Sequence, residues 1–214
     1  MKIYVFGGGG HAKVVVGTLL ELGMTIEGIF DDRSEKWGDE ILGIKIVGPV
    51  SEGAKISGSG SAGVIAVGDN RMRLRLAHLL KGWRWITAVH PRAWVHSSVQ
   101  LGPGTIVLAG AMIQPNVRIG AHCIINTGAT IDHDCTLGDF VHVAPGVNLG
   151  GNIFLGIGSF VGIGGVIIPG IHVGEWASVG AGGVVIQDVP SYTTVAGVPA
   201  RVIRGAQTEA EKII

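Results

Sequence analysis

The sequence predicts two domains of different class: an N-terminal α/β unit and then an all-β solenoid of short, stacked strands. Three observations predict this division. The first 88 residues contain a strand, a glycine-rich loop, a helix and a second strand, whereas from Val95 an aliphatic residue recurs at every sixth position. The chain also has 37 glycines among 214 residues, which fits a backbone that turns often. We therefore expect domains at residues 1–88 and 89–200 and a C-terminal tail at 201–214.

The six-residue period is unbroken over sixteen positions, all of them Val, Ile or Leu. They are Val95, Leu101, Val107, Ile113, Ile119, Ile125, Ile131, Leu137, Val143, Leu149, Leu155, Val161, Ile167, Val173, Val179 and Val185. Glycine follows eight of them, where we expect it to supply the dihedral angles of a tight turn. One hexad cannot bury its aliphatic side chain alone, so stacked coils must bury a continuous apolar column.

Bulk properties narrow the class of protein. Sixteen basic and sixteen acidic residues give a formal net charge of zero, and nothing favours nucleic acid or an anionic membrane as a partner. Met1 leads into an apolar strand without a signal-peptide pattern, and no apolar stretch is long enough to cross a bilayer. We therefore expect a cytoplasmic protein. Cys123 and Cys135 lie two periods apart, which predicts small, buried and reduced side chains rather than a disulfide.

The N-terminal unit combines an apolar strand at residues 2–6 with four consecutive glycines and a helix that begins near His11. Strands at 25–30 and 62–67 and a helix at 71–81 should follow. A Rossmann-like βαβ unit of this kind offers a phosphate site, because free N–H groups and the helix dipole at the helix start favour an anion. The loop is an incomplete dinucleotide motif and no second nucleotide-binding half follows, which argues against a dehydrogenase.

Two acidic residues, Asp31 and Asp32, end the second strand about twenty residues after the loop. An acid in this position can bind ribose or a base edge. A solvated turn or a helix cap explains the same residues equally well, so the sequence leaves both interpretations open.

The hexads resemble the hexapeptide-repeat acyltransferase family over residues 95–190. The resemblance implies a left-handed parallel β-helix with three hexads per coil, and acyl transfer from acetyl-CoA. It also implies a homotrimer with active sites in the clefts between neighbouring subunits. A non-enzymatic solenoid scaffold is the alternative, because a fold alone does not determine function.

The order of a glycine-rich βαβ unit and hexads resembles, over nearly the whole chain, the bacterial sugar acetyltransferases of the PglD, PerB and NeuD type. The resemblance implies that the N-terminal domain binds the nucleotide of a nucleotide-linked amino sugar. It implies a phosphate loop formed by Gly8, Gly9, Gly10 and His11, and acids near the nucleoside at Asp31 and Asp32.

Acetyl transfer to an amine needs a base and hydrogen-bond donors for the thioester carbonyl. His133, between Asp132 and Asp134, lies two residues after inward-facing Ile131 and so near a turn. The resemblance implies that His133 is the general base and that Asp134 orients it, with an arm shorter than that of a Glu. An exposed turn histidine is the alternative for His133.

Other residues should bind acetyl-CoA, as the resemblance implies. They are Asn126, His142, Gly151 as an oxyanion N–H donor, and Gly162 and Gly180, which should leave room beside the backbone. Arg201 and Arg204 could meet coenzyme A phosphates or cap the open end of the solenoid. The remaining candidates are expected to be ordinary surface or linker histidines: His90, His96, His122 and His172. The His and Cys spacing does not match a zinc site, so we expect no metal.

The function implied is N-acetylation of a UDP-, GDP- or dTDP-linked 4-amino sugar for bacterial glycan biosynthesis. O-acetylation of sialic acid or another sugar is the enzymatic alternative. The sequence does not separate an amine from a hydroxyl acceptor, because both require a base near the thioester.

Overall fold

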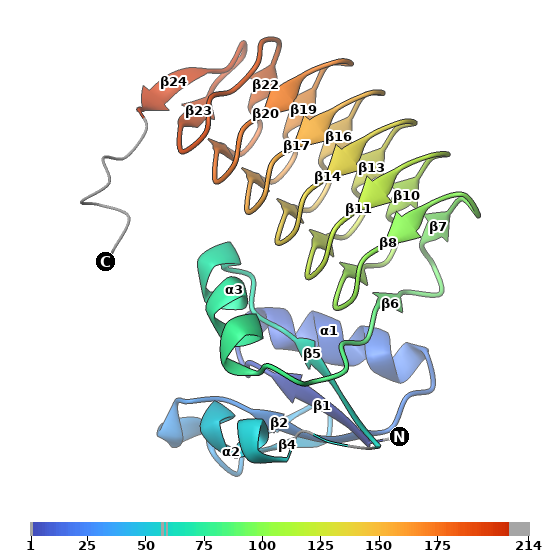
Figure 1. Ribbon diagram of the computed structural model, residues 1–214, viewed down its shortest axis with the longest axis vertical. Coiled ribbons are helices and arrows are strands. Elements are labelled where there is room, and N and C mark those ends of the chain that lie inside the picture. Colours follow the sequence, from blue (N-terminus) through green and yellow to red (C-terminus); the bar gives the residue numbers. More distant parts are fainter. Residues whose placement is uncertain (1, 57, 59, 206–214) are drawn as a thin grey trace.

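The computed structural model describes residues 2–56, 58 and 60–205. An α/β domain lies at one end, and a column of stacked coils rises from it (Figure 1). Among the described residues, no helix is long and apolar enough to span a membrane.

The N-terminal domain is a five-stranded sheet in the order β3-β4-β2-β1-β5, parallel except for the β3–β4 pair. Its strands are β1 (Lys2–Phe6), β2 (Ile26–Phe30), β3 (Glu40–Ile41), β4 (Ile44–Gly48) and β5 (Ser61–Ile65). Its helices are α1 (Gly10–Glu21), α2 (Val50–Lys55), α3 (Asn70–Leu79) and the short 3-10 helix η1 (Ser34–Lys36). The predicted strands and helices are therefore present.

Two separate cores cover the faces of this sheet. Aliphatic residues of α1 such as Val15 and Leu19 pack with the solenoid residues Ile106 and Leu108 in one core. The second core is aromatic, and Phe6 meets the Trp83 ring edge-on at a centroid distance of 4.9 Å. The first core therefore continues from the N-terminal domain into the solenoid.

The solenoid is a three-sided parallel β-helix. Face 1 contains β7 (Trp94–Val95), β10 (Met112–Ile113), β13 (Thr130–Ile131), β16 (Asn148–Leu149), β19 (Val166–Ile167) and β22 (Val184–Val185). Face 2 contains β8 (Gln100–Leu101), β11 (Arg118–Ile119), β14 (Thr136–Leu137), β17 (Phe154–Leu155) and β20 (His172–Val173). Face 3 contains β6 (Ala88–Val89), β9 (Ile106–Val107), β12 (Ile124–Ile125), β15 (His142–Val143), β18 (Phe160–Val161), β21 (Ser178–Val179), β23 (Thr194–Ala196) and β24 (Arg201–Arg204).

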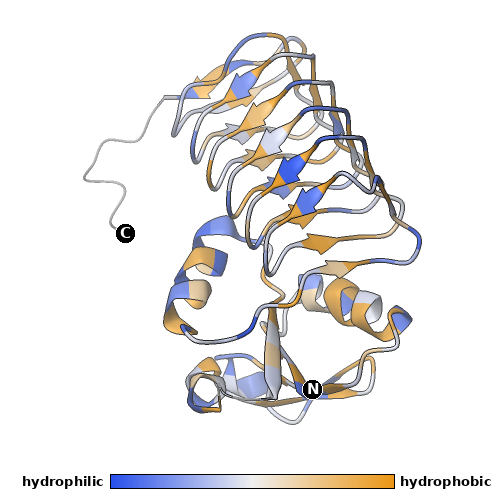
Figure 2. Ribbon diagram, turned by 45° about the vertical axis from the view of Figure 1, so that its right-hand side comes forward, coloured by the Kyte–Doolittle hydropathy of each residue, from blue (hydrophilic) through white to orange (hydrophobic). Residues whose placement is uncertain are grey.

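The six-residue period is confirmed by the strand pairing. Ile113 pairs with Ile131 and Ile131 with Leu149, so one coil is three hexads. The aliphatic series is buried from Val107 to Val185, and Cys123 and Cys135 are buried and free, as predicted. Figure 2 shows hydrophobic segments recurring in every coil, with hydrophilic segments between them.

The turns between faces, called corners here, explain where glycine is needed. The sequence predicts the turn dihedral angles directly after each aliphatic residue. The residues with left-handed φ angles lie two positions further along, as in Gly158 at +66° and Trp176 at +54°. The glycine that directly follows the aliphatic residue serves another purpose. A Cβ on Gly156 would lie 2.6 Å from the Glu175 backbone nitrogen, and one on Gly162 would lie 2.7 Å from that of Ala181. These glycines permit close stacking of coils, and the contact of Gly162 and Gly180 with coenzyme A stays a prediction.

Helix α3 joins the domains by lying along corner 2/3, the turns from face 2 to face 3. Asn70 Nδ2 donates to the Gly158 and Ser159 carbonyls at 3.0 and 3.1 Å. The Arg71 guanidinium lies over the Trp176 ring at 4.9 Å from the centroid. The α/β domain is therefore tied to several successive coils.

At the other end, the predicted tail begins as strand. Residues Arg201–Arg204 form β24, antiparallel to β23, and all four are exposed. Residues 206–214 lie outside the described part of the chain. The proposed contact of Arg201 and Arg204 with coenzyme A stays a prediction.

Candidate active site

The glycine loop joins β1 to α1 at the carboxyl edge of the sheet. Gly7 has a φ of +108°, and a Cβ there would lie 2.6 Å from Val67 Cγ2, so glycine is required. The Gly8 N–H donates to Asp31 Oδ2 at 2.6 Å. Helix α1 begins at Gly10, and no described side chain caps it. Uncapped N–H groups at a helix start suit a phosphate.

Asp31 braces this loop from inside the protein. It is 6% exposed, and Arg33 Nε and Nη2 each donate to its carboxylate at 2.7 Å. The hydrogen bond from Arg33, with that from Gly8, lowers the pKa of Asp31 to about 2, so the group stays ionised. Asp32 is exposed and accepts from the Val50 N–H at 2.9 Å. Both acids thus have partners within the domain, and contact with a nucleoside stays a prediction for each.

Two cations beside the loop were missed at the sequence level. Lys36 Nζ donates to the Gly8 carbonyl at 3.1 Å, and Arg33 Nη2 lies 3.7 Å from where a Cβ on Gly9 would be. Both follow directly after β2, in the segment that contains Asp31 and Asp32. A diphosphate at the loop would meet their positive charges.

His11 points from the loop toward the solenoid. Its ring centroid lies 6.3 Å from that of His142, and its Nε2 is buried without a partner among the described residues. Burial, and then the charge of Arg73, lowers the pKa of His11 to about 4. The two domains therefore meet between these two neutral rings.

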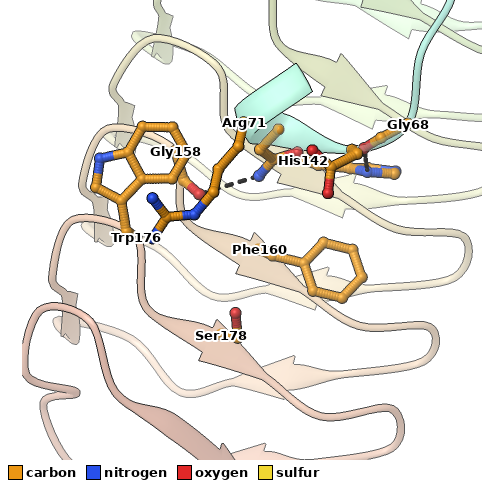
Figure 3. A pocket seen from close by; sticks show the side chains of 9 residues that line it. Gly68, Arg71, His142, Gly158, Phe160, Trp176 and Ser178 are labelled. Atoms are coloured by element: carbon orange, nitrogen blue, oxygen red, sulfur yellow. Dashed lines mark hydrogen bonds between the residues drawn. The ribbon is translucent and has the colours of Figure 1, made fainter. Parts of the chain in front are cut away.

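His142 is held at both ring nitrogens. Nδ1 lies 3.2 Å from the Gly68 carbonyl oxygen, and Nε2 lies 3.1 Å from Asn126 Nδ2. Burial lowers the pKa of His142 to about 4. Figure 3 shows the first of these contacts beside a cavity of about 420 Å³ that reaches Arg71 and Trp176. The structure thus brings the predicted residues Asn126 and His142 together.

His133 and Asp134 form an exposed pair at corner 1/2, as the sequence placed them. His133 Nδ1 lies 2.7 Å from Asp134 Oδ2, so the shorter aspartate arm does reach the ring. The hydrogen bond with Asp134, and then the charge of Asp132, raises the pKa of His133. Asn116 Nδ2 donates to the other Asp134 oxygen at 3.1 Å. The histidine is therefore oriented and made more basic.

Gly151 lies directly beside this histidine, one coil further along. A Cβ on Gly151 would lie 2.7 Å from His133 Cε1. Among the described residues, no acceptor takes the Gly151 N–H, whereas the N–H of the next residue, Asn152, donates to the His133 carbonyl. An unused N–H next to a base is what an oxyanion donor requires.

Within one chain, the two halves of the predicted site lie on different edges of the solenoid. His133 and Gly151 lie on corner 1/2, whereas Asn126 lies with Gly162 and Gly180 on corner 3/1. His142 lies on face 3. Because a coil has three edges, residues near in sequence lie on different sides of the column.

The prediction that His122 is an ordinary surface residue is wrong. It is 5% exposed, its ring stacks on Phe140 at 5.2 Å, and it meets Trp85 edge-on at 4.9 Å. Burial lowers its pKa to about 4. The reason is the docking of the N-terminal domain on this corner, which a solenoid pattern does not reveal. His172 is exposed as predicted, and His90 and His96 are partly exposed. No group of three or more His, Cys, Asp or Glu in the described part of the chain could hold a metal ion.

Comparisons with known proteins match both domains. The family model described as the PglD N-terminal domain matches residues 2–80, and that described as bacterial transferase hexapeptide (six repeats) matches residues 98–133. PerB from Caulobacter crescentus, solved in complex with CoA and GDP-perosamine, is 39% identical with a TM-score of 0.89, covering 94% of this chain and 97% of that one. This chain belongs to the PglD/PerB family of hexapeptide-repeat sugar acetyltransferases.

Two further proteins are similar to this chain. The acetyltransferase domain of PglB from Neisseria gonorrhoeae FA1090, in complex with acetyl coenzyme A, is 35% identical with a TM-score of 0.88, covering 94% of this chain and 98% of that one. An uncharacterized protein of Acanthamoeba polyphaga mimivirus is 33% identical over 107 residues, which are 50% of this chain and 21% of that protein. The predicted fold, an α/β domain followed by a left-handed parallel β-helix, is confirmed.

Proposed function

We propose that this protein is an acetyl-CoA-dependent N-acetyltransferase that acts on the amino group of a nucleotide-activated amino sugar. The observation that carries the proposal is the match to PerB, bound to CoA and GDP-perosamine, across both domains. The oriented His133–Asp134 pair would supply the general base, and the glycine loop would supply the phosphate site. The proposed setting is bacterial glycan assembly in the cytoplasm.

The substrate would bind across the two domains. Its diphosphate would accept from the N–H groups at the start of α1, with Arg33 and Lys36 beside it. The sugar would then pass His11 toward His142, whose ring centroids are 6.3 Å apart. This direction leads the amino group from the nucleotide-binding domain to the solenoid.

The reaction itself needs one proton transfer and one bond exchange. The neutral amine attacks the thioester carbonyl carbon, a C–N bond forms, and the C–S bond breaks. His133 takes up the proton that the attacking amine loses, and the coenzyme leaves as a thiolate that is then protonated. The Gly151 N–H would stabilise the negative oxygen as it develops. Asn126 and His142 would hold the acetyl donor, beside Gly162 and Gly180.

The complete site would form between copies in a homotrimer. Corners 1/2 and 3/1 are the two edges of face 1, so three copies with face 1 toward a common axis would bring His133 of one near Asn126 of the next. Face 1 and its edges also carry exposed apolar side chains: Trp94, Met112, Ile163, Ile168 and Ile186. Such a surface favours association.

The experiment supplies acetyl-CoA with UDP-, GDP- or dTDP-linked 4-amino sugars and follows thiol release. We expect turnover with at least one of them, and a fall in kcat of about 100- to 10,000-fold for His133→Ala. His78→Ala, which changes an exposed histidine on α3, is the control and should stay active. Turnover on sialic acid alone would replace N-acetylation by O-acetylation, and unchanged activity of His133→Ala would refute the mechanism.

A further inference from the structure

Arg73 of α3 lies almost completely buried between the two domains, at 1% exposure. No ion pair joins it to a carboxylate in the described part of the chain. A buried cation without an anion is unfavourable unless its N–H groups find good acceptors. Five uncharged oxygens accept from it: the carbonyls of Val67, Gly68, His122 and Phe140, and Asn70 Oδ1, at 2.8 to 3.1 Å.

These acceptors come from both domains. His122 and Phe140 are the left-handed residues of two successive turns at corner 2/3, with φ of 53° and 60°. Val67 and Gly68 belong to the segment after β5, in the N-terminal domain. Arg73 therefore connects that segment directly to the backbone of the solenoid.

The Gly68 carbonyl is the acceptor that matters for the site. It accepts from Arg73 Nη1 at 3.1 Å and faces His142 Nδ1 at 3.2 Å. A carbonyl oxygen can only accept, so His142 Nδ1 must carry the proton. The opposite nitrogen, Nε2, then offers its lone pair.

Asn126 confirms this tautomer independently. Its Oδ1 accepts from the Thr127 N–H at 2.8 Å, which leaves its Nδ2 facing His142 Nε2 at 3.1 Å. An amide nitrogen only donates, so Nε2 accepts. The chain of contacts runs from Arg73 through Gly68 and His142 to Asn126.

We propose that Arg73 is a positioning residue for acetyl transfer, which fixes the Gly68 carbonyl and thereby the Nδ1-protonated tautomer of His142 and the direction of the Asn126 amide. The inference rests on the proposed function, in which Asn126 and His142 hold the acetyl donor. With one Nδ2 hydrogen bound by His142, the other is left for the acetyl carbonyl.

The same contact couples the two domains. Strands β1 and β5 are parallel neighbours with Phe6 paired to Ile65, so the phosphate loop and the Val67–Gly68 segment follow adjacent strand ends. Gly7 packs closely against Val67, as the 2.6 Å approach of its added Cβ shows. The segment that orients His142 is therefore in contact with the loop proposed to bind the nucleotide.

The test uses ¹⁵N-labelled histidine in the full-length protein. The parent should show His142 with a protonated Nδ1 and an unprotonated Nε2 at neutral pH. Arg73→Met should give a mixture of tautomers and a fall in kcat of about 10- to 100-fold, with KM for the nucleotide sugar changed far less. Arg73→Lys keeps the charge but not the planar fork that spans both domains, and should behave similarly.

Arg75→Met is the matched control, because Arg75 is an exposed arginine on the same helix. It should change neither the spectrum nor kcat. A folded Arg73→Met with an unchanged tautomer and kcat would overturn the proposal, and so would a parent with the proton on Nε2, even if the variants do not fold. The spectrum needs no turnover, so an inactive parent would count against the proposed function alone.

Discussion

Three histidines around the proposed site differ in protonation for identifiable reasons. Burial lowers the pKa of His11 and His142 to about 4, so both are neutral at pH 7. Asp134 raises the pKa of the exposed His133 above its ordinary 6.5. Of these three, only His133 has a raised pKa, and it is the one assigned as base.

This assignment predicts a specific pH dependence. The base must be unprotonated, so kcat/KM should rise with pH, with a midpoint above about 6.5 in the parent. Asp134→Asn replaces the carboxylate whose hydrogen bond raises the pKa of His133 by a neutral amide, so the midpoint should move down and the plateau should fall. The measurement is kcat/KM against pH for the parent and for Asp134→Asn with the same amino sugar. Because the amine titrates identically in both experiments, a difference in midpoint reports on His133. Identical midpoints would contradict the role of Asp134.

Among the structural elements, the turns of the solenoid carry most of the proposed site. At corner 1/2 the coils stack so closely that Gly151 leaves no space for a side chain beside His133. Elsewhere the same tightness serves packing alone, as at Gly156 against Glu175. Close stacking of the coils therefore packs the solenoid and also places Gly151 next to His133.

Gly151→Ala tests whether the close approach of Gly151 to His133 matters for catalysis. The new Cβ would lie 2.7 Å from His133 Cε1, and because this ring is exposed it can swing away at little cost to stability. We expect kcat to fall about 10- to 100-fold with the melting temperature nearly unchanged. Gly17→Ala, where the nearest atom would be an ordinary 3.6 Å away, should leave kcat unaltered. A fully active Gly151→Ala would argue against the catalytic position of His133.

At the scale of the whole molecule, the domain interface makes the fold sensitive to acid. His11, His122 and His142 have pKa values lowered to about 4 in the folded protein, against an ordinary 6.5. Between these values the unfolded chain binds more protons than the folded one. The stability that the three neutral rings contribute is therefore complete above about pH 6.5 and is lost progressively toward pH 4.

His122→Phe should reduce this sensitivity. Phe140 adopts the same left-handed turn conformation one coil later, so a phenyl ring is compatible with the backbone there. We expect the drop in melting temperature between about pH 7 and pH 4.5 to be smaller than in the parent, since one proton-binding group is removed. His78→Phe, at an exposed position, should leave the slope as it is. An equal slope for His122→Phe would show that His122 does not govern acid unfolding.

The proposed trimer gives a second prediction at this scale. Ile163 is 62% exposed at corner 3/1, on the edge that would meet the neighbouring copy. Ile163→Asp should shift the sedimentation coefficient from trimer to monomer and abolish turnover, because a buried charge opposes association. Ile56→Asp, at a 42% exposed position outside the solenoid, is the control. A parent that sediments as a monomer and is active would exclude a shared site.

The sequence by itself determined the architecture of the solenoid. The unbroken series from Val95 to Val185 was enough, because burying one aliphatic side chain per hexad is a repeated local requirement that each coil meets with its neighbours. The glycine loop and the His133–Asp134 pair were also visible, because residues adjacent in sequence supply them.

Only the tertiary structure decided which residues meet across the domains. Arg73 reaches Phe140 across 67 positions, and His142 reaches Gly68 across 74. Such contacts depend on how α3 docks against corner 2/3, and that docking buries His122, a residue whose solenoid position alone would be solvated. The three-edged coil likewise separates His133 from His142, although the two lie only nine positions apart in the sequence. Periodicity reports what each coil buries, whereas docking between elements distant in sequence determines where the chemistry is assembled.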